Sequence, residues 1–313
     1  MQNQSQEWQL LEKVVMASVQ EQKKRRRWRI FFLFLTFIYL AVVISLYSAD
    51  KEDLSSVTHS ANHTAFIKIT GPIMEGEAAE AAAINKGLRK AFKTDTAKAI
   101  LLVINSPGGS PVQAGYVYDE IKRLRAKYPE KKVYAVVSDM AASAAYYIAS
   151  AADEIYADKA SLVGSIGVIS ASFGYTGAME KVGVERRVFS SGENKAFLDP
   201  FQPLKSEEVD YWQGSLNVVY QQFIDQVKKG RGDRLVVDEY TFSGRVWPGE
   251  VALKKGLVDG LGSPTYVARE VVKVEKLMNY SVEVSPMAKF LKQLSASMAK
   301  EIHAAFTKPS MSL

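Results

Sequence analysis

The sequence predicts an α/β protein built on a mostly parallel sheet. From about residue 64 onward, apolar runs of strand length alternate with stretches rich in helix-forming residues, which is the pattern of successive βα units. Two of the runs, AKAILLVIN (97–105) and KVYAVVSD (132–139), are apolar almost without interruption. Strands that are buried on both faces have this composition.

Charge and cysteine content narrow the classes of function. The 313-residue chain has a net charge of +6 and no cysteine, which excludes disulfides and thiolate metal sites. Residues 1–29 contain seven Lys or Arg and three Glu, so they carry +4 and the other residues carry +2. The basic character is therefore mostly N-terminal, and we expect no nucleic-acid-binding surface on the main domain.

The segment IFFLFLTFIYLAVVISLY (30–47) contains no charged residue. As a helix it would be about 27 Å long, close to the roughly 30 Å hydrocarbon layer of a bilayer. It predicts a single transmembrane signal anchor over residues 30–48. The basic cluster KKRRRWR (23–29) precedes it, so residues 1–29 are expected in the cytoplasm and the remainder on the exported side.

Two alternatives compete with an uncleaved anchor. A cleaved signal peptide would have a shorter basic region, a shorter apolar segment and a small-residue cleavage site, whereas no clear A-x-A motif follows here. A buried core helix would rarely be so uniformly apolar. The anchor is the preferred interpretation.

The remaining elements follow in order. Residues 49–63 are polar and unpatterned and predict a linker. The main domain is expected over residues 64–280. Its predicted strands and helices, besides the two buried strands, are TAFIKIT (64–70, strand), 75–93 (helix), 111–127 (helix), the run after Ser143 (helix), 161–170 (strand), 173–183 (helix), 185–191 (strand) and 205–229 (helix).

The C-terminal tail (281–313) predicts an amphipathic helix from about Pro286. Its apolar residues recur at spacings of three and four, and lysines lie between them. A membrane surface could bind such a helix. Packing against a partner subunit or against the domain itself is the favoured alternative.

Two loops that follow buried strands are candidates for chemistry. In parallel α/β sheets, ligands gather beyond the carboxyl ends of the strands. NSPGGS (105–110) contains Gly108 and Gly109, which allow a turn that points backbone N–H groups at an anion. SDMAAS (138–143) brings Ser143 to the start of the next helix, whose dipole favours a developing oxyanion. The alternatives are an ordinary turn and an ordinary N-cap.

A serine nucleophile requires a base. The chain has three histidines, of which His59 and His63 fall in the predicted linker and His303 in the tail. A Ser-His-Asp triad is therefore not expected. Lysine is the other known partner of serine, provided that an enclosed site favours loss of its proton. Composition does not identify which lysine this would be.

Five segments in this order resemble the signal peptide peptidase A family, peptidase family S49: INSPGG (104–109), DMAASAAYYIA (139–149), SLVGSIGVI (161–169), SGENKAFLDPF (191–201) and GRVWPGEVALKKGLVDGLG (244–262). The resemblance implies a crotonase/Clp-protease-like fold of repeated ββα units. It also implies a membrane-anchored serine endopeptidase without metal or other cofactor, in the bacterial inner membrane with its protease domain on the periplasmic side. The implied partners are remnant signal peptides and other hydrophobic peptides, membrane lipid around the anchor, and further copies of the chain in a homo-oligomer.

The same resemblance implies roles for five residues. Ser143 matches the nucleophile and Lys195 the general base of a Ser-Lys dyad. Ser165 matches a serine that hydrogen-bonds the lysine. The backbone N–H groups of Gly109 and Ala144 match the oxyanion hole.

The sequence departs from the family at two places. The family usually has Ser-Gly-Gly at the nucleophile, whereas this chain has Ser143-Ala144-Ala145, and the added methyl groups could narrow the cleft. Trp247-Pro248 replaces a commoner Tyr-Thr. Two other functions are considered, a catalytically impaired membrane scaffold of the same fold and a crotonase-type acyl-CoA enzyme.

Overall fold

The computed structural model describes residues 16, 23–42 and 61–282. The chain divides into two units, Met1–Ala61 and Asn62–Leu313, and each is considered by itself. In the first unit, residues 23–42 are helical. Among the described residues, none of the helices combines the length and the apolar composition needed to cross a bilayer. The end of the predicted anchor (43–48), most of the predicted linker and the amphipathic tail lie outside the described residues.

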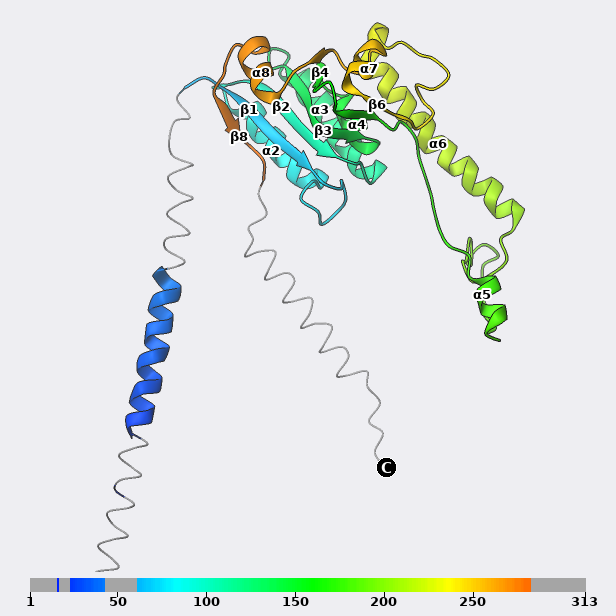
Figure 1. Ribbon diagram of the computed structural model, residues 1–313, viewed down its shortest axis with the longest axis horizontal. Coiled ribbons are helices and arrows are strands. Elements are labelled where there is room, and N and C mark those ends of the chain that lie inside the picture. Colours follow the sequence, from blue (N-terminus) through cyan, green and yellow to red (C-terminus); the bar gives the residue numbers. More distant parts are fainter. Residues whose placement is uncertain (1–15, 17–22, 43–60, 283–313) are drawn as a thin grey trace, which may run out of the picture. The chain divides into compact units, whose positions relative to one another are not determined.

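The second unit is built on one eight-stranded sheet, in which β6, β5, β3, β2, β1 and β8 are neighbours in that order (Figure 1). β4 pairs with the first half of β3 and with β7, while β5 pairs with the last residues of β3. All pairs are parallel except β5 with β6. The strands are β1 (His63–Thr70), β2 (Ala97–Ser106), β3 (Val133–Ala142), β4 (Glu154–Ala157), β5 (Leu162–Gly164), β6 (Val246–Pro248), β7 (Gly260–Leu261) and β8 (Leu277–Asn279).

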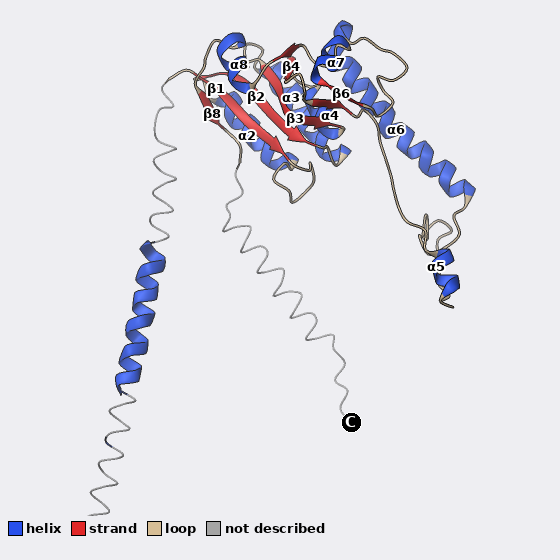
Figure 2. Ribbon diagram, viewed as in Figure 1, coloured by secondary structure: helices blue, strands red, loops and turns tan. Residues whose placement is uncertain are grey.

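The helices cover both faces of this sheet (Figure 2). They are α2 (Ala81–Lys93), α3 (Pro111–Lys127), α4 (Ala144–Ala149), α5 (Thr176–Lys181), α6 (Ser206–Arg231), α7 (Gly249–Lys254) and α8 (Pro264–Tyr266), with the short turns η1 (Gly232–Arg234) and η2 (Val267–Val271). In β2, Ile100, Leu102 and Ile104 belong to the large core, while Ala99 and Leu101 pack with Val267 of η2 in a smaller one. This double coverage explains why the β2 sequence is apolar without alternation.

Three expectations need correction. The linker ends before His63, because this residue is buried in β1 and its Nε2 lies 2.9 Å from Tyr280 Oη. The strand predicted over 161–170 is confined to Leu162–Gly164, and residues 185–191 form no strand. The order also differs from a ββα repeat, because β1, β2 and β3 are each followed directly by a helix.

The segment from about residue 169 to 205 forms an arm that leaves the sheet after β5 and returns through α6 (Figure 1). No residue of α5 is buried. The arm is held together by Tyr175 stacked on Phe201 at 5.1 Å and by an Arg186–Asp199 ion pair. Residues 185–191 lie on this arm, where none of the described strands pairs with them, which is why the predicted strand does not form.

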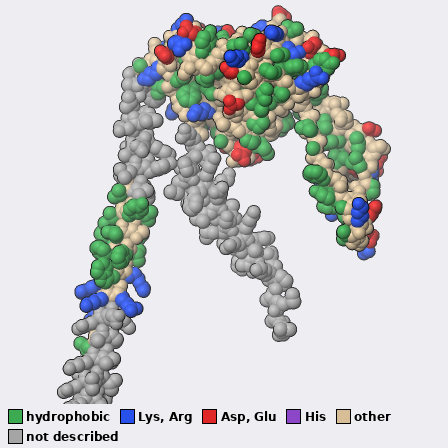
Figure 3. Space-filling model, in the orientation of Figure 1, with side chains coloured by type: hydrophobic (Ala, Val, Ile, Leu, Met, Phe, Trp, Pro, Cys, Tyr) green, Lys and Arg blue, Asp and Glu red, His purple; other side chains and the backbone are tan. Residues whose placement is uncertain are grey.

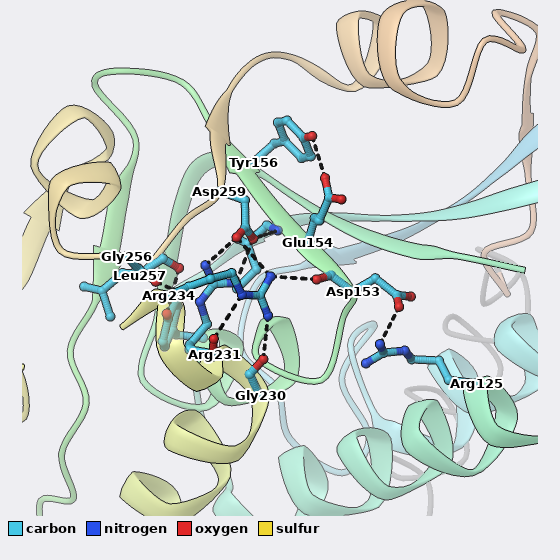
Figure 4. Close-up of polar contacts among 12 residues, drawn as sticks. Arg125, Asp153, Glu154, Tyr156, Gly230, Arg231, Arg234, Gly256, Leu257 and Asp259 are labelled. Carbon is cyan, nitrogen blue, oxygen red and sulfur yellow. Dashed lines mark hydrogen bonds and ion pairs between the residues drawn. The ribbon is translucent and has the colours of Figure 1, made fainter. Parts of the chain in front are cut away.

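An ion-pair network fixes the C-terminal end of α6 to the sheet (Figure 4). The guanidinium group of Arg231, 1% exposed, donates to both carboxylate oxygens of Asp259 at 2.7 and 2.8 Å. Arg234 donates to Asp259 as well, and the Ile155 N–H binds the same carboxylate. Burial alone would raise the pKa of Asp259, but the hydrogen bonds and charge of Arg231 outweigh it and lower that pKa below its ordinary value.

We predict that Asp259→Asn lowers the free energy of unfolding by about 3 to 5 kcal/mol, because it leaves a buried guanidinium group without its counter-charge. The folded-state pKa of Asp259 lies below the unfolded value of about 3.9. Its contribution is therefore fully present above about pH 4 and is lost as the pH falls through the folded-state pKa. Urea unfolding of the full chain at several pH values, followed by circular dichroism, measures both effects. If the variant unfolds at the same urea concentration as the parent, the Arg231–Asp259 ion pair does not stabilise the fold.

Candidate active site

Ser143 lies on a sharp turn between β3 and α4. Its φ of 54° and ψ of −125° are unusual for a residue with a side chain, and such a conformation costs about 1 to 3 kcal/mol. Its hydroxyl does not cap α4, so the N-cap alternative is wrong. The turn is held by the Ser143 N–H, which donates to the Gly164 carbonyl at 2.8 Å, and by the Tyr147 N–H, which donates to the Ser143 carbonyl at 3.0 Å.

The loop between β2 and α3 packs directly against this turn. A Cβ atom added to Gly108, whose φ is +103°, would lie 2.8 Å from the Ser143 Cβ and 3.0 Å from the Ala144 nitrogen. Only glycine permits this close approach. The loop is tied down on its other side, because the Ile73 N–H donates to the Gly108 carbonyl and the Ser110 N–H to the Ile73 carbonyl.

Two backbone donors beside Ser143 are left without an acceptor. Within the described part of the chain, the N–H groups of Gly109 and Ala144 make no hydrogen bond, and both residues line one cavity with Ser143. Unpaired amides of this kind can stabilise an oxyanion. Ala144 and Ala145 do not have positive φ and open α4 with helical backbone, so this chain does not need glycine there.

Two cavities meet at Ser143. The smaller, of about 130 Å³, is partly apolar and is bounded by Ala114, Tyr147 and Phe223. The larger, of about 730 Å³, is an open groove along α6. Gly167, Val168 and Ile169 line both. The arrangement provides an extended trough with a pocket beside the hydroxyl.

Ser165 lies in the larger cavity together with Ser143. It too has a positive φ, 51°, and its N–H donates to the Arg245 carbonyl at 2.7 Å. The structure therefore brings four of the five predicted site residues together: Ser143, Ser165, Gly109 and Ala144.

Lys195 is not brought to Ser143 within one chain. It lies on the exposed arm, and neither cavity at Ser143 includes it. Among the described residues that line these two cavities there is no Lys, His, Asp or Glu. Burial raises the pKa of Tyr147, so this residue stays protonated and is a poor base.

Histidine supplies no base for Ser143 within residues 61–282. His63 begins β1, whereas Ser143 follows the end of the parallel strand β3. The two residues therefore lie at opposite ends of the sheet. His59 and His303 lie outside the described residues.

Sequence reasoning missed several residues that shape the site. The Gly164 carbonyl fixes the nucleophile turn, and Gly108 provides the close approach. The Gly108-Gly109 pair in the sequence predicted a tight turn, but it did not indicate which of the two glycines packs against Ser143. Nothing in the local sequence indicated that Phe223, far along α6, would close the small cavity.

We predict that Gly108→Ala displaces the Ser143 turn. The variant should lower the rate of Ser143 acylation by a serine-reactive probe at least about tenfold and destabilise the fold by about 1 to 3 kcal/mol, because of the close contact and the positive φ. Mass spectrometry of the labelled chain and thermal unfolding measure the two effects. Gly115→Ala is the matched control, since a Cβ there meets nothing within 4 Å. Equal labelling of both variants would show that the close approach is unimportant.

Comparison with known proteins agrees with this geometry. Residues 125–278 match the model of peptidase family S49, and residues 49–176 match that of Clp protease. The chain is 33% identical over 225 residues to the chloroplastic serine protease SPPA of Arabidopsis thaliana, covering 69% of this chain and 33% of that protein. It is 34% identical over 209 residues to a provisionally named protease of Synechocystis sp., covering 66% of this chain and 72% of that protein.

Another relative carries a different name. A Brucella melitensis protein named Na(+)/H(+) antiporter NhaA is 49% identical over 175 residues, which is 56% of this chain. The match covers only 24% of that protein. The chain therefore corresponds to only part of the length of several of its relatives. The family models, the protease relatives and the serine turn agree with one another, and the chain belongs to peptidase family S49, the signal peptide peptidase A family.

Proposed function

We propose that this chain is a serine endopeptidase in which Ser143 is the nucleophile. The observation that carries the proposal is the pair of unpartnered N–H groups, from Gly109 and Ala144, beside a strained serine in a partly apolar cavity. A strained strand-to-helix turn exposes a serine hydroxyl for attack. Leaving two amide N–H groups without an acceptor in a site that excludes water costs free energy. An oxyanion that develops beside them supplies the missing acceptor.

In this mechanism Lys195 is the general base. The neutral amine takes the hydroxyl proton of Ser143 as Oγ bonds to the carbonyl carbon of the substrate. The resulting oxyanion accepts hydrogen bonds from the two amides. Lys195 then gives the proton to the leaving amine, and later activates the water that hydrolyses the acyl-enzyme. Ser165 is proposed to orient the lysine amine.

We infer that the lysine comes from a second copy of the chain. The arm that carries Lys195 is exposed, and large apolar residues on it face solvent, among them Phe173 at 77% and Phe189 at 94%. Apolar surface of this extent is typical of an interaction site. Figure 3 shows hydrophobic side chains along the arm. A homo-oligomer would cover them and complete the site.

The proposed substrates are hydrophobic peptides, including remnant signal peptides, bound in extended form. The backbone of Gly167, Val168 and Ile169 makes no hydrogen bond to other described residues and borders both cavities. A peptide can pair with such a segment as an added strand. The small cavity would then receive one apolar side chain. We further propose that residues 30–48 anchor the chain in the bacterial inner membrane with the protease domain on the periplasmic side, which the charge-free segment and its basic N-terminal flank support.

We predict that Ser143→Ala lowers peptide hydrolysis by at least about a thousandfold without unfolding the chain, because the nucleophile is lost. A fluorogenic apolar peptide measures the rate, and an acylating probe should no longer label the chain. Ser190→Ala, an exposed serine on the arm, is the control and should keep full activity. If Ser143→Ala hydrolyses the peptide normally, the nucleophile is another residue.

A chain that folds but neither reacts with the probe nor hydrolyses peptides would favour the non-catalytic scaffold. Specific binding of coenzyme A would favour the acyl-CoA enzyme.

We also predict that two inactive variants complement each other. Ser143→Ala keeps the lysine and Lys195→Ala keeps the serine, so a co-expressed equal mixture should recover activity at about a quarter of the sites if neighbouring copies share each site. Lys205→Ala, another exposed lysine of the arm, should behave as the parent. No recovery in a mixture shown to be co-assembled would contradict a shared site. Substantial activity of purified Lys195→Ala would contradict the dyad.

A further inference from the structure

A second groove lies between α2 and α3, apart from the cavities at Ser143. It has a volume of about 720 Å³, which is within the range of ligand-binding sites. Its lining residues are Glu75, Glu80, Ala81, Ala82, Asn85, Arg89, Gln113, Tyr116, Asp119, Glu120 and Arg123. The mechanism proposed above uses none of them.

Two side-chain amides, Asn85 and Gln113, lie at the floor of this groove. Asn85 is 8% exposed, and its Nδ2 donates to the Tyr116 carbonyl at 3.2 Å, across the space between the helices. Its Oδ1 is buried and has no hydrogen-bond partner. Gln113 Oε1 accepts from the Ala81 N–H, which leaves its amide NH₂ available. The Gln113 NH₂ can donate to a backbone carbonyl of a bound peptide, whereas Asn85 Oδ1 is covered by protein atoms.

The rim of the groove is acidic. Four carboxylates face two guanidinium groups, a net charge of −2. The carboxylate of Glu120 already pairs with both arginines, because its two oxygens accept hydrogen bonds from Arg89 and Arg123. The hydrogen bond from Arg123 contributes most to lowering the pKa of Glu120 to about 2. Glu75 and Asp119 make no ion pair with other described residues. Acidic side chains gather in Figure 3 where Figure 1 draws the loop between β1 and α2.

The groove adjoins the active site through the first turn of α3. Gln113 lines the groove, whereas Pro111 and Ala114 line the small cavity at Ser143. The loop that carries Glu75 also carries Ile73, which bridges to Gly109. One polypeptide could therefore occupy the active-site trough and cross this turn into the groove.

We propose that the α2–α3 groove is a second peptide-binding site, which holds a Lys- or Arg-containing flank of an apolar substrate. The inference rests on the proposed peptidase function. Lysine and arginine accumulate at the ends of apolar membrane segments, so an apolar peptide released from a membrane brings such a flank with it. The unpaired carboxylates attract its side chains, the exposed ring of Tyr116 offers a cation–π surface, and the Gln113 amide donates to its backbone.

The test compares two fluorogenic peptides that share one apolar core and differ only in a Lys-Lys or Gln-Gln flank, each placed at either end. We expect the parent chain to have a KM about tenfold lower for a Lys-Lys peptide, since each exposed ion pair contributes up to about fivefold. Glu75→Gln/Asp119→Asn should remove most of this preference and leave kcat and the Gln-Gln KM unchanged. Glu77→Gln/Glu130→Gln removes two exposed charges outside the groove and should keep the preference.

Other outcomes overturn the inference. Equal KM values for the two flanks in the parent, or equal losses in both double variants, would exclude recognition by the groove. A changed oligomeric mass of Glu75→Gln/Asp119→Asn in light scattering would identify the groove as a subunit contact instead. If no peptide is hydrolysed, the peptidase proposal fails separately. Binding of a labelled Lys-Lys peptide to Ser143→Ala, measured by fluorescence anisotropy, then tests the groove by itself. Loss of binding when Glu75→Gln/Asp119→Asn is added would support peptide binding in the groove, and unchanged binding would refute it.

Discussion

The backbone conformation of Ser143 is the constraint on which the rest of the site depends. A positive φ at a serine is unfavourable, and three contacts maintain it: the hydrogen bond to the Gly164 carbonyl, the start of α4, and the close packing of Gly108. Because Ala144 is the first residue of α4, its N–H has no acceptor within the helix, and the Gly108 loop brings Gly109 to the same cavity. The strain and the unpaired donors are thus two results of one local arrangement.

Helix α6 connects the arm, the two cavities at Ser143 and the sheet. Its first turns hold the base of the arm, where the Leu198 N–H donates to Glu208 and Phe197 packs edge-on against Trp212. Its middle lines both cavities at Ser143. Its last residue, Arg231, is clamped by Asp259. The attachment at the C-terminal end of α6 therefore supports the wall of the larger cavity at Ser143 and the base of the arm that carries Lys195.

The sequence predicted the parts of the fold in which local pattern and burial agree. The apolar runs of β2 and β3 and the long helix α6 lie close to their expected positions. Prediction failed where the deciding contact is absent or lies far along the chain. Residues 185–191 are expected as a strand from the succession of elements along the chain, yet on the arm no described strand lies beside them. His63 resembled a linker residue because its partner, Tyr280, is 217 residues away.

The sequence by itself determined the α/β class, the grouping of Ser143 and Gly109 at the carboxyl ends of neighbouring strands, and the absence of thiol chemistry, because each depends on residue type and short-range order. Only the tertiary structure decided that Ser143 is strained rather than a cap, that Ala144 can replace glycine, and that Lys195 lies away from Ser143 in a single chain. These features arise from contacts between β2, β5, α4 and the arm. Contacts between segments so far apart follow from how the chain packs, which no local pattern encodes.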